Sequence, residues 1–355
     1  MPELLEPPVT DSVASFASDA PATPAARMSD RDILIATRPF TKESRAKSWW
    51  VLLSTLAVLG VFFTTAALAP WWPVKIAASL CGSLVMVRGF IIYHDHMHGA
   101  IFRKSFVAGT ILRLYGSLFL CPPSYWRETH NYHHSHVGAI EASSVGSFPI
   151  MPLTEWKQAG FWKRFYYHIA RHPLTYALAY VTVFFFSNAL NPFIRNPIRN
   201  WQCGLAIVLH AALIALLWWA GGWTVALLCF VGPYALASAL GAYLFYAQHN
   251  FVGMRILKDG EWTNARASLE CSSFLKASRL THWLTGEIGF HHIHHLNCTI
   301  PFYRLREAME SVPALQNPPT TTLWPRDVWN CLRLKVWDET QGRMLTFKEA
   351  NAAKV

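Results

Sequence analysis

The sequence contains no Cys-x-x-Cys pair and no His-Glu-x-x-His motif. Its seven cysteines are widely spaced, several of them inside apolar runs, so we predict free thiols that pack as small hydrophobic side chains rather than disulfides or an iron–sulfur cluster. Without the second motif, a zinc hydrolase of the metalloprotease type is not expected. No contiguous basic stripe accompanies the formal charge of +10, which argues against nucleic acid as a partner. An anionic lipid leaflet or an acidic protein is the better counterpart for this charge.

The first residues lack an apolar stretch behind a basic start. Residues 1–26 are instead rich in Pro, Ala and Ser. This composition is typical of a disordered tail and argues against a secretory signal peptide. We therefore assign residues 1–30 to an N-terminal tail and 31–48 to a segment that precedes the membrane.

Long apolar runs are abundant in the chain. Its hydrophobic content is 52% and its mean hydropathy is +0.20, and sixteen Trp and twelve Tyr residues supply rings that favour a lipid–water boundary. A helix of about 20 apolar residues crosses a bilayer. Short turns, one containing Pro70 and Pro73 and the other Gly221 and Gly222, join the candidates in pairs, which predicts two helical hairpins. The candidate spans are 49–69, 74–93, 203–220 and 223–246.

Eleven of the sixteen histidines fall into three clusters, at 94–98, 130–136 and 291–295, each beside an apolar stretch. Imidazole is a good ligand for iron, zinc and copper. One ion rarely takes more than four protein ligands, so eight or more clustered histidines predict a site for two ions, and we favour iron. Buried histidines that bind no metal would each need a separate hydrogen-bond partner, which makes chance clustering the weaker explanation.

The spacing inside each cluster places several rings on one face of a helix. Residues three or four apart on a helix are neighbours, and the first cluster contains one such pair while the second and third each repeat a pattern of i, i+3 and i+4. The other histidines of the clusters, His96, His136 and His292, lie on other faces of a regular helix, and we expect a supporting or surface role for them. The predicted ligands are His94, His98, His130, His133, His134, His291, His294 and His295.

Metal-bound imidazoles usually donate their second N–H to a carboxylate or carbonyl group. Each polar residue near the clusters could provide that acceptor, or could instead cap a helix or face the solvent. The candidates for this supporting role are Asp95, Glu128, Glu287 and Asn297.

Five histidines lie outside the clusters. His168, His172 and His210 have no companion at ligand spacing, so we expect hydrogen-bonded or interfacial positions for them. His249 ends the last apolar run as the first cluster ends the second run, which makes it a candidate for the metal site. His282 precedes the third cluster by nine residues and is a weaker candidate.

The three clusters can share metal ions only if they lie on one membrane face, which requires an even number of crossings between them. The borderline apolar segment 174–190 should therefore not cross, and 106–123, which contains Arg113, is too short and too charged to do so. Lys and Arg residues near these segments predict that this face is cytoplasmic.

We predict an all-α, multi-pass integral membrane protein with four transmembrane helices and a cytoplasmic helical cap that carries the clusters. Its segments are 49–93 for the first hairpin, 94–202 for a cytoplasmic or interfacial region, 203–247 for the second hairpin and 248–355 for the remaining cap.

The three clusters and their flanks resemble the membrane-bound fatty-acid desaturases. The family pattern H-x3-H, H-x2-H-H and H-x2-H-H matches the eight predicted ligands in order. The resemblance covers about residues 49–306, and the flanks look like those of bacterial acyl-lipid desaturases of the Δ12 or ω-6 type. The matching stretches are HDHMHG at 94–99, WRETHNYHH at 126–134, TGEIGFHHIHHLN at 285–297 and IPFY at 300–303.

The resemblance implies a non-haem di-iron centre that uses O₂ to place a cis double bond in the acyl chain of a membrane lipid. It also implies an extra histidine ligand from outside the clusters, for which His249 is the best match. A separate ferredoxin or cytochrome should supply the electrons, because the chain lacks the His-Pro-Gly-Gly motif of a fused cytochrome domain. His282 departs from the pattern of these relatives, so we expect it not to be a ligand.

Two other interpretations fit the sequence. Carotenoid or alkane hydroxylases and ketolases also use histidine-rich motifs, and their products would carry oxygen in place of a new double bond. A membrane metal-binding or transport protein would hold its ligands near the bilayer midplane rather than at the ends of the spans.

Overall fold

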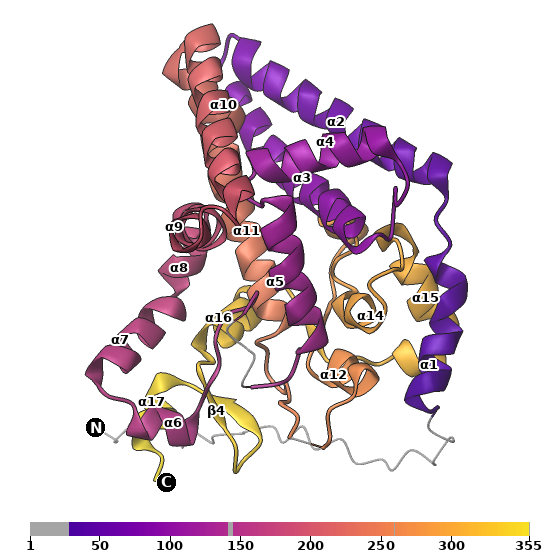
Figure 1. Ribbon diagram of the computed structural model, residues 1–355, viewed down its shortest axis with the longest axis vertical. Coiled ribbons are helices and arrows are strands. Elements are labelled where there is room, and N and C mark those ends of the chain that lie inside the picture. The colour runs from indigo at the N-terminus through magenta and orange to yellow at the C-terminus, as the bar shows by residue number, and fades with distance from the viewer. Residues whose placement is uncertain (1–27, 141–144, 259, 355) are drawn as a thin grey trace, which may run out of the picture.

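The computed structural model describes residues 28–140, 145–258 and 260–354 (Figure 1). The predicted tail, 1–30, lies outside the described residues except for its last three. Helix α1 (Asp30–Thr37) begins at the end of that range, where Ser29 Oγ accepts the backbone N–H of Asp32 at 3.2 Å and caps the helix.

The first two long apolar helices, α2 (Arg45–Leu68) and α3 (Trp72–His98), pack against each other. Pro73 lies in the first turn of α3, where a missing N–H removes no helical hydrogen bond. The helix ends at Gly99, whose φ of +74° is the left-handed conformation that suits glycine. The second predicted span therefore continues through the first histidine cluster as one helix.

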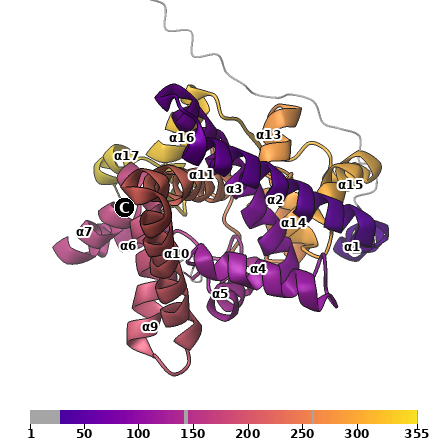
Figure 2. The ribbon, with the colours of Figure 1, turned by 90° about the horizontal axis from the view of Figure 1, so that it is seen from above.

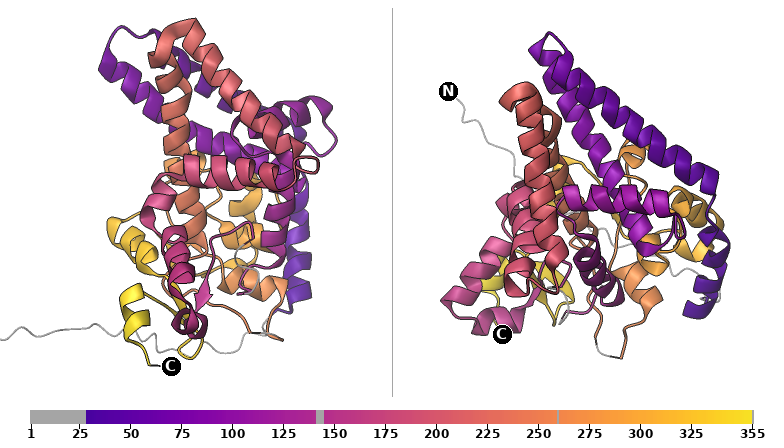
Figure 3. Two further views of the ribbon diagram at one scale, coloured as in Figure 1. Left: turned by 60° about the vertical axis from the view of Figure 1, so that its left-hand side comes forward. Right: turned by 45° about the horizontal axis from the view of Figure 1, so that its top comes forward.

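The third apolar stretch, Trp201–Gln248, is 48 residues long. A straight helix of that length would measure about 70 Å, more than twice the hydrocarbon thickness of a bilayer. The backbone departs from helical geometry at Gly221 and Gly222, the second with a φ of +74°. Figure 3 shows the chain rising to one end of the molecule and returning from this break. The parts are α10 (Trp201–Ala226), η3 (Leu227–Val231) and α11 (Gly232–Gln248).

Length and composition allow three helical stretches of the described residues to cross a membrane, or four if a bent pair counts as one span. The bent pair is α4 (Phe106–Leu118) and α5 (Pro123–Ser135), which meet at 86°. Helix α4 packs on α3 and α10, while the Phe106 and Val107 side chains at its start are exposed.

The segment 174–190, expected not to cross, is not among the candidate spans. This segment contains most of α8 (Pro173–Ala177) and all of the π-helix η2 (Tyr180–Leu190). Helix η2 continues directly into α9 (Asn191–Arg195). In Figure 3 these helices lie crosswise at the base of the pair formed by α10 and α11.

The chain is mostly helical, but the expectation of an all-helical protein is wrong in one detail, because the described residues include five short strands that form two small sheets. In the first sheet β1 pairs parallel to β4, which pairs antiparallel to β5; in the second, β2 pairs parallel to β3. The strands are β1 (Met151–Pro152), β2 (Phe274–Leu275), β3 (Thr320–Thr321), β4 (Val336–Asp338) and β5 (Arg343–Leu345).

Short helices joined by loops make up the rest of the described chain. Among them, α14 lies beside the lower part of α5, whereas α6, α7 and α17 lie at the lower left of the view (Figure 1). The short helices are η1 (Arg38–Thr41), α6 (Leu153–Gln158), α7 (Phe161–Ala170), α12 (Asn264–Glu270), α13 (Arg279–Leu284), α14 (His291–Leu296), η4 (Phe302–Arg304), α15 (Leu305–Ser311), η5 (Pro313–Leu315), α16 (Pro325–Arg333) and α17 (Phe347–Ala352).

Candidate functional site

The structure brings the nine histidines predicted as ligands together at the ends of four helices. The first cluster is the last part of α3, the second lies on α5 and the third forms most of α14, while His249 directly follows α11. The rings form two groups, within each of which one nitrogen per residue lies within 4.8 Å of all the others. The five-histidine group is His94, His98, His130, His134 and His294; the four-histidine group is His133, His249, His291 and His295.

The division between the groups follows helix geometry more closely than cluster membership. Each i, i+4 pair stays within one group, because such residues are stacked on one helix face. The i+3 residue of the second cluster, His133, belongs to the four-histidine group, and the corresponding residue of the third cluster, His294, belongs to the five-histidine group. Helices α5 and α14 therefore each contribute to both groups, which makes the two groups neighbours.

The nitrogens of the five-histidine group converge. The Nε2 atom of His130 lies 3.0 Å from Nε2 of His94 and 3.1 Å from Nε2 of His134. The Nε2 atom of His134 lies 3.1 Å from Nε2 of His294. The Nε2 atom of His98 is buried and has no hydrogen-bond partner.

The four-histidine group has the same arrangement around a residue that lies outside the three clusters. The Nε2 atom of His249 is 3.1 Å from Nε2 of His133 and 2.8 Å from Nε2 of His291. The Nε2 atom of His295 lies 3.0 Å from that of His291. The Nδ1 atom of His249 faces the backbone carbonyl of Cys271 at 3.3 Å, which orients its ring.

The donor set fits metal ions. A neutral imidazole has one N–H and one lone pair, so an Nε2 atom with two ring neighbours can make a hydrogen bond to only one of them. Ligand nitrogens about 2.1 Å from one ion lie about 3 Å apart when their bonds are at right angles. A cation within each group would accept the converging lone pairs and would remove the need for the missing hydrogen bonds.

Six ligand histidines of the second and third clusters have a lowered pKa. Burial, with smaller contributions from neighbouring imidazoles, holds their pKa well below the usual value of about 6.5, so that their lone pairs are free to bind a metal at neutral pH. The residues with this shift are His130, His133, His134, His291, His294 and His295.

Of the four polar residues considered for a supporting role, only Asp95 contacts a ligand ring. Its Oδ1 atom lies 3.1 Å from Nδ1 of His94, and its Oδ2 atom accepts the backbone N–H of Phe302 at 2.7 Å. The carboxylate thus leaves Nε2 of His94 as the free nitrogen and ties the end of α3 to η4.

The other three polar residues are directed elsewhere, and their positions do not support the expected role. Glu128 is exposed and forms an ion pair with Arg199. Glu287 accepts a hydrogen bond from Arg306, and Asn297 donates one to Thr37. Proximity in sequence was misleading here, because consecutive residues on these short helices and loops point to different sides.

Aromatic rings enclose both groups, and their role was not predicted from the sequence. Trp126 stacks on His130 with ring centroids 4.3 Å apart and an interplanar angle of 21°. The ring centroids of Phe245 and His133 are 5.0 Å apart. The sequence does contain a signal, because each aromatic residue precedes a predicted ligand on its own chain segment by four residues: Trp126 before His130, and Phe245 before His249.

The remaining histidines lie outside the two groups. His292 is buried, with Nε2 3.2 Å from the carbonyl oxygen of Leu315. His282, expected not to be a ligand, is also buried and faces Phe274 and Phe290. His210 lies 2.7 Å from the carbonyl oxygen of Leu118, as expected of a hydrogen-bonded histidine. Other contacts join His96 to Ile101 and His136 to Tyr132.

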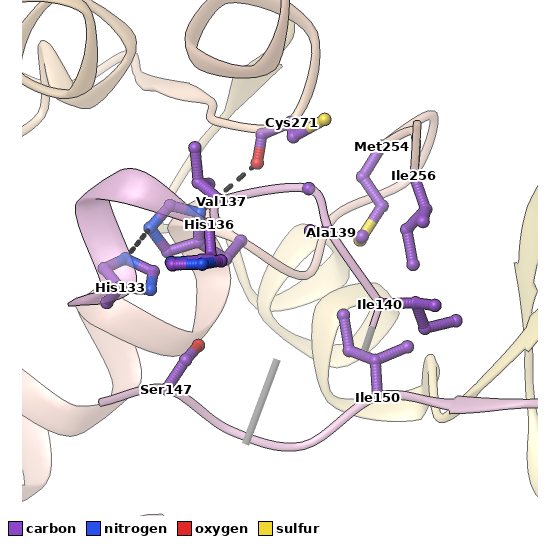
Figure 4. A pocket seen from close by; sticks show the side chains of 12 residues that line it. His133, His136, Val137, Ala139, Ile140, Ser147, Ile150, Met254, Ile256 and Cys271 are labelled. Atoms are coloured by element: carbon purple, nitrogen blue, oxygen red, sulfur yellow. Dashed lines mark hydrogen bonds between the residues drawn. The ribbon is translucent and has the colours of Figure 1, made fainter. Parts of the chain in front are cut away.

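A small pocket reaches the four-histidine group from one side (Figure 4). Its walls are mainly apolar, and His133 and His249 are among the residues that line it. The cavity measures about 30 Å³, room for very few water molecules. The lining residues are His133, His136, Val137, Gly138, Ala139, Ile140, Ser147, Ile150, His249, Met254, Ile256 and Cys271.

Known proteins are similar in sequence to this chain over most of its length. It is 29% identical over 324 residues to a "Fatty acid desaturase" of Bacillus subtilis (strain 168), covering 90% of each chain. It is 25% identical to an "sn-1 oleoyl-lipid 12-desaturase" of Synechocystis, covering 86% of each chain. An "sn-1 acyl-lipid omega-3 desaturase (ferredoxin)" of Nostoc is 20% identical, over 87% of this chain and 88% of the relative.

Residues 69–324 match the family described as "Fatty acid desaturase". The match includes all three histidine clusters and His249, so it spans every helix that supplies a ring to the two groups. The chain therefore belongs to the fatty acid desaturase family and is a desaturase, an oxidoreductase.

Proposed function

We propose that this protein is an O₂-dependent acyl-lipid desaturase in which the two histidine groups each bind one iron ion. One observation carries the proposal: nine histidines from four chain segments converge in two adjacent groups, with their Nε2 atoms directed inward. Imidazole is a suitable ligand for iron, and an all-nitrogen site without cysteine argues against structural zinc.

When bound, the iron ions would supply the oxidising power that no side chain has, namely removal of two hydrogens from an unactivated pair of methylene groups at the expense of O₂. The protein supplies position and environment. Asp95 orients His94, and the carbonyl of Cys271 orients His249. Trp126 and Phe245 cover the rings and limit access of water.

For the substrate we propose an acyl chain of a membrane lipid, with the new cis bond at a Δ12 or ω-6 position. The names of two relatives that cover most of this chain, an oleoyl-lipid 12-desaturase and an acyl-lipid omega-3 desaturase, support a lipid substrate, and the first name also supports the Δ12 position. The second name also includes ferredoxin, which supports an external ferredoxin as electron donor, with a cytochrome as the alternative.

We further propose four membrane crossings, arranged as hairpins over 49–93 and 203–247. The break at Gly222 supports the second hairpin, because a 48-residue apolar stretch is too long for one crossing. The regions 94–202 and 248–355, which contain the clusters, would then lie together on the cytoplasmic face.

Expression in a host that makes no polyunsaturated lipids tests the function directly. We expect a new double bond in the host's acyl chains, and chromatography with chemical cleavage at the double bond gives its position. His133→Ala and His294→Ala, one from each group, should each abolish the product while the protein still inserts in the membrane. His249→Ala should do the same.

His168→Ala is the matched control, because this exposed histidine lies outside both groups. Its product yield should equal that of the parent. Oxygenated carotenoid or alkanol in place of an unsaturated lipid would establish a hydroxylase or ketolase instead, and zinc without iron would favour a metal-binding or transport protein.

A further inference from the structure

A polar cleft opens beside the five-histidine group. Its volume is about 610 Å³. The end of α3, the loop after it, α4 and α5 supply most of the walls. The lining residues are Thr41, Glu43, His96, Met97, His98, Gly99, Ala100, Arg103, Arg113, Arg127 and Thr299.

The cleft carries excess positive charge. Arg103, Arg113 and Arg127 come from three different chain segments, are exposed, and form no ion pair or hydrogen bond with the described residues. The only acidic lining residue is Glu43, and its carboxylate already accepts the backbone N–H of Phe102 at 2.8 Å and lies 3.4 Å from Arg45. A concave surface lined by charge of one sign concentrates the electric field and attracts a partner of the opposite sign.

The cleft also reaches the metal site. His98 lines it and is the one member of the two groups that is not buried. Its Nε2 atom points inward and is buried, so the rest of the ring separates the five-histidine group from the cleft. Among the described histidines of the site, His98 is therefore the one that an outside protein can approach.

We propose that an acidic one-electron donor protein docks in the cleft formed by Arg103, Arg113 and Arg127, with its redox centre facing the His98 ring. This inference rests on the proposed function, which needs electrons from outside. Two donor molecules, each oxidised by one electron, two protons, one O₂ and the two hydrogens removed from the acyl chain give one double bond and two molecules of water.

The arrangement of the arginines favours a protein over the phosphate of a lipid. All three guanidinium groups are exposed and spread over separate segments, whereas a built phosphate site holds its ligand with buried donors. Exposed charges suit a small, hydrated and short-lived contact of the kind made by electron-transfer partners, in which charge complementarity speeds association and selects the partner.

Binding of an acidic [2Fe–2S] ferredoxin to the full-length protein in lipid nanodiscs tests the docking surface without measuring activity. We expect the affinity to fall as salt is added. Replacement of all three arginines, as Arg103→Gln, Arg113→Gln and Arg127→Gln together, should weaken binding at least tenfold and flatten the salt dependence. Iron content and the unfolding temperature should match those of the parent.

The matched control removes three exposed cations from helices on another side of the molecule (Figure 2), as Arg326→Gln, Arg333→Gln and Lys348→Gln together. This variant has the same net charge as the arginine variant and should bind ferredoxin like the parent. Equal weakening in both variants, no weakening in the arginine variant, or no binding by the parent would overturn the proposal.

A second binding measurement separates the lipid alternative. Vesicles containing phosphatidylglycerol replace ferredoxin, and we expect the arginine variant to bind them like the parent. Selective loss of vesicle binding with intact ferredoxin binding would assign the cleft to lipid phosphate. Because neither measurement depends on turnover, failure of the docking surface is distinguishable from failure of the desaturase function.

Discussion

At the scale of single residues, the site depends on orientation as much as on proximity. The rings need their Nε2 atoms free and directed inward, and Asp95 achieves this for His94 while also holding Phe302. Several other rings have a buried Nδ1 atom without a partner, including those of His134 and His294. The orientation of these rings must come from packing, as in the stack of Trp126 on His130.

Asp95→Asn should weaken metal binding by the five-histidine group. An amide is a weaker acceptor than a carboxylate and cannot hold the imidazole tautomer as firmly, and losses of about 10- to 100-fold in metal affinity or activity are typical for such partners. Iron content after dialysis against a graded chelator series measures the effect. Glu128→Gln, at an acid directed to Arg199, is the control and should retain the parent's iron; equal retention in both variants would remove Asp95 from the supporting role.

Acid should destabilise the metal-free protein through its buried histidines. Burial lowers the pKa of His249 and of His292 to about 4, against about 6.5 in an unfolded chain. Between these values the unfolded state binds more protons than the folded state, so the free energy of unfolding falls as the pH drops from about 6.5 to about 4. Thermal unfolding of the chelator-treated protein in detergent at a series of pH values checks this, and an unfolding temperature that rises with acid in this window would contradict it.

At the scale of the elements, helix periodicity explains both what the sequence predicted and where it failed. The sequence predicted the apolar runs, the turn at Gly221 and the ligand spacing, because hydropathy and the 3.6-residue helical period are local properties of the sequence. The sequence did not predict that His133 and His294 belong to a different group from the other ligands of their own clusters, because this depends on how α5 and α14 face each other. The small sheets were missed for a similar reason, since strands of two or three residues, such as Phe274–Leu275, leave no alternating pattern.

The loop before α14 is closely packed against α3 at one glycine. A Cβ atom at Gly286 would lie 2.8 Å from both Cβ and Cγ2 of Ile91, and the residue has a φ of +54°. Gly286→Ala should therefore displace the third cluster and lower stability by about 1–3 kcal/mol. Gly253→Ala is the control, because Gly253 also has a positive φ, of +85°, but no atom within 4 Å of the added Cβ.

Thermal unfolding of both glycine variants separates packing from backbone strain. We expect a clear loss of stability and of bound iron for Gly286→Ala. Gly253→Ala should show only the smaller cost of a left-handed backbone and should keep its iron. Similar losses of stability in the two variants would mean that contact with Ile91 does not position the cluster.

At the scale of the whole molecule, long-range convergence turns short local motifs into one site. His94 and His294 are 200 positions apart in the sequence, yet their ring centroids lie 4.5 Å apart. The end of α3, helix α5, the residue that follows α11 and helix α14 meet at the two histidine groups. Spacing alone predicted eight ligands for two ions and made His249 a further candidate, and the family resemblance then matched His249 to the extra ligand.

Metal analysis of the intact protein distinguishes a site for two iron ions from the alternatives. The protein should be purified from cells without added metal, and iron and zinc should be measured per chain by mass spectrometry. We expect about two iron ions per chain, with loss of iron in both His133→Ala and His294→Ala, since each of these residues belongs to a different group. A single ion per chain, or zinc with no iron, would contradict this expectation.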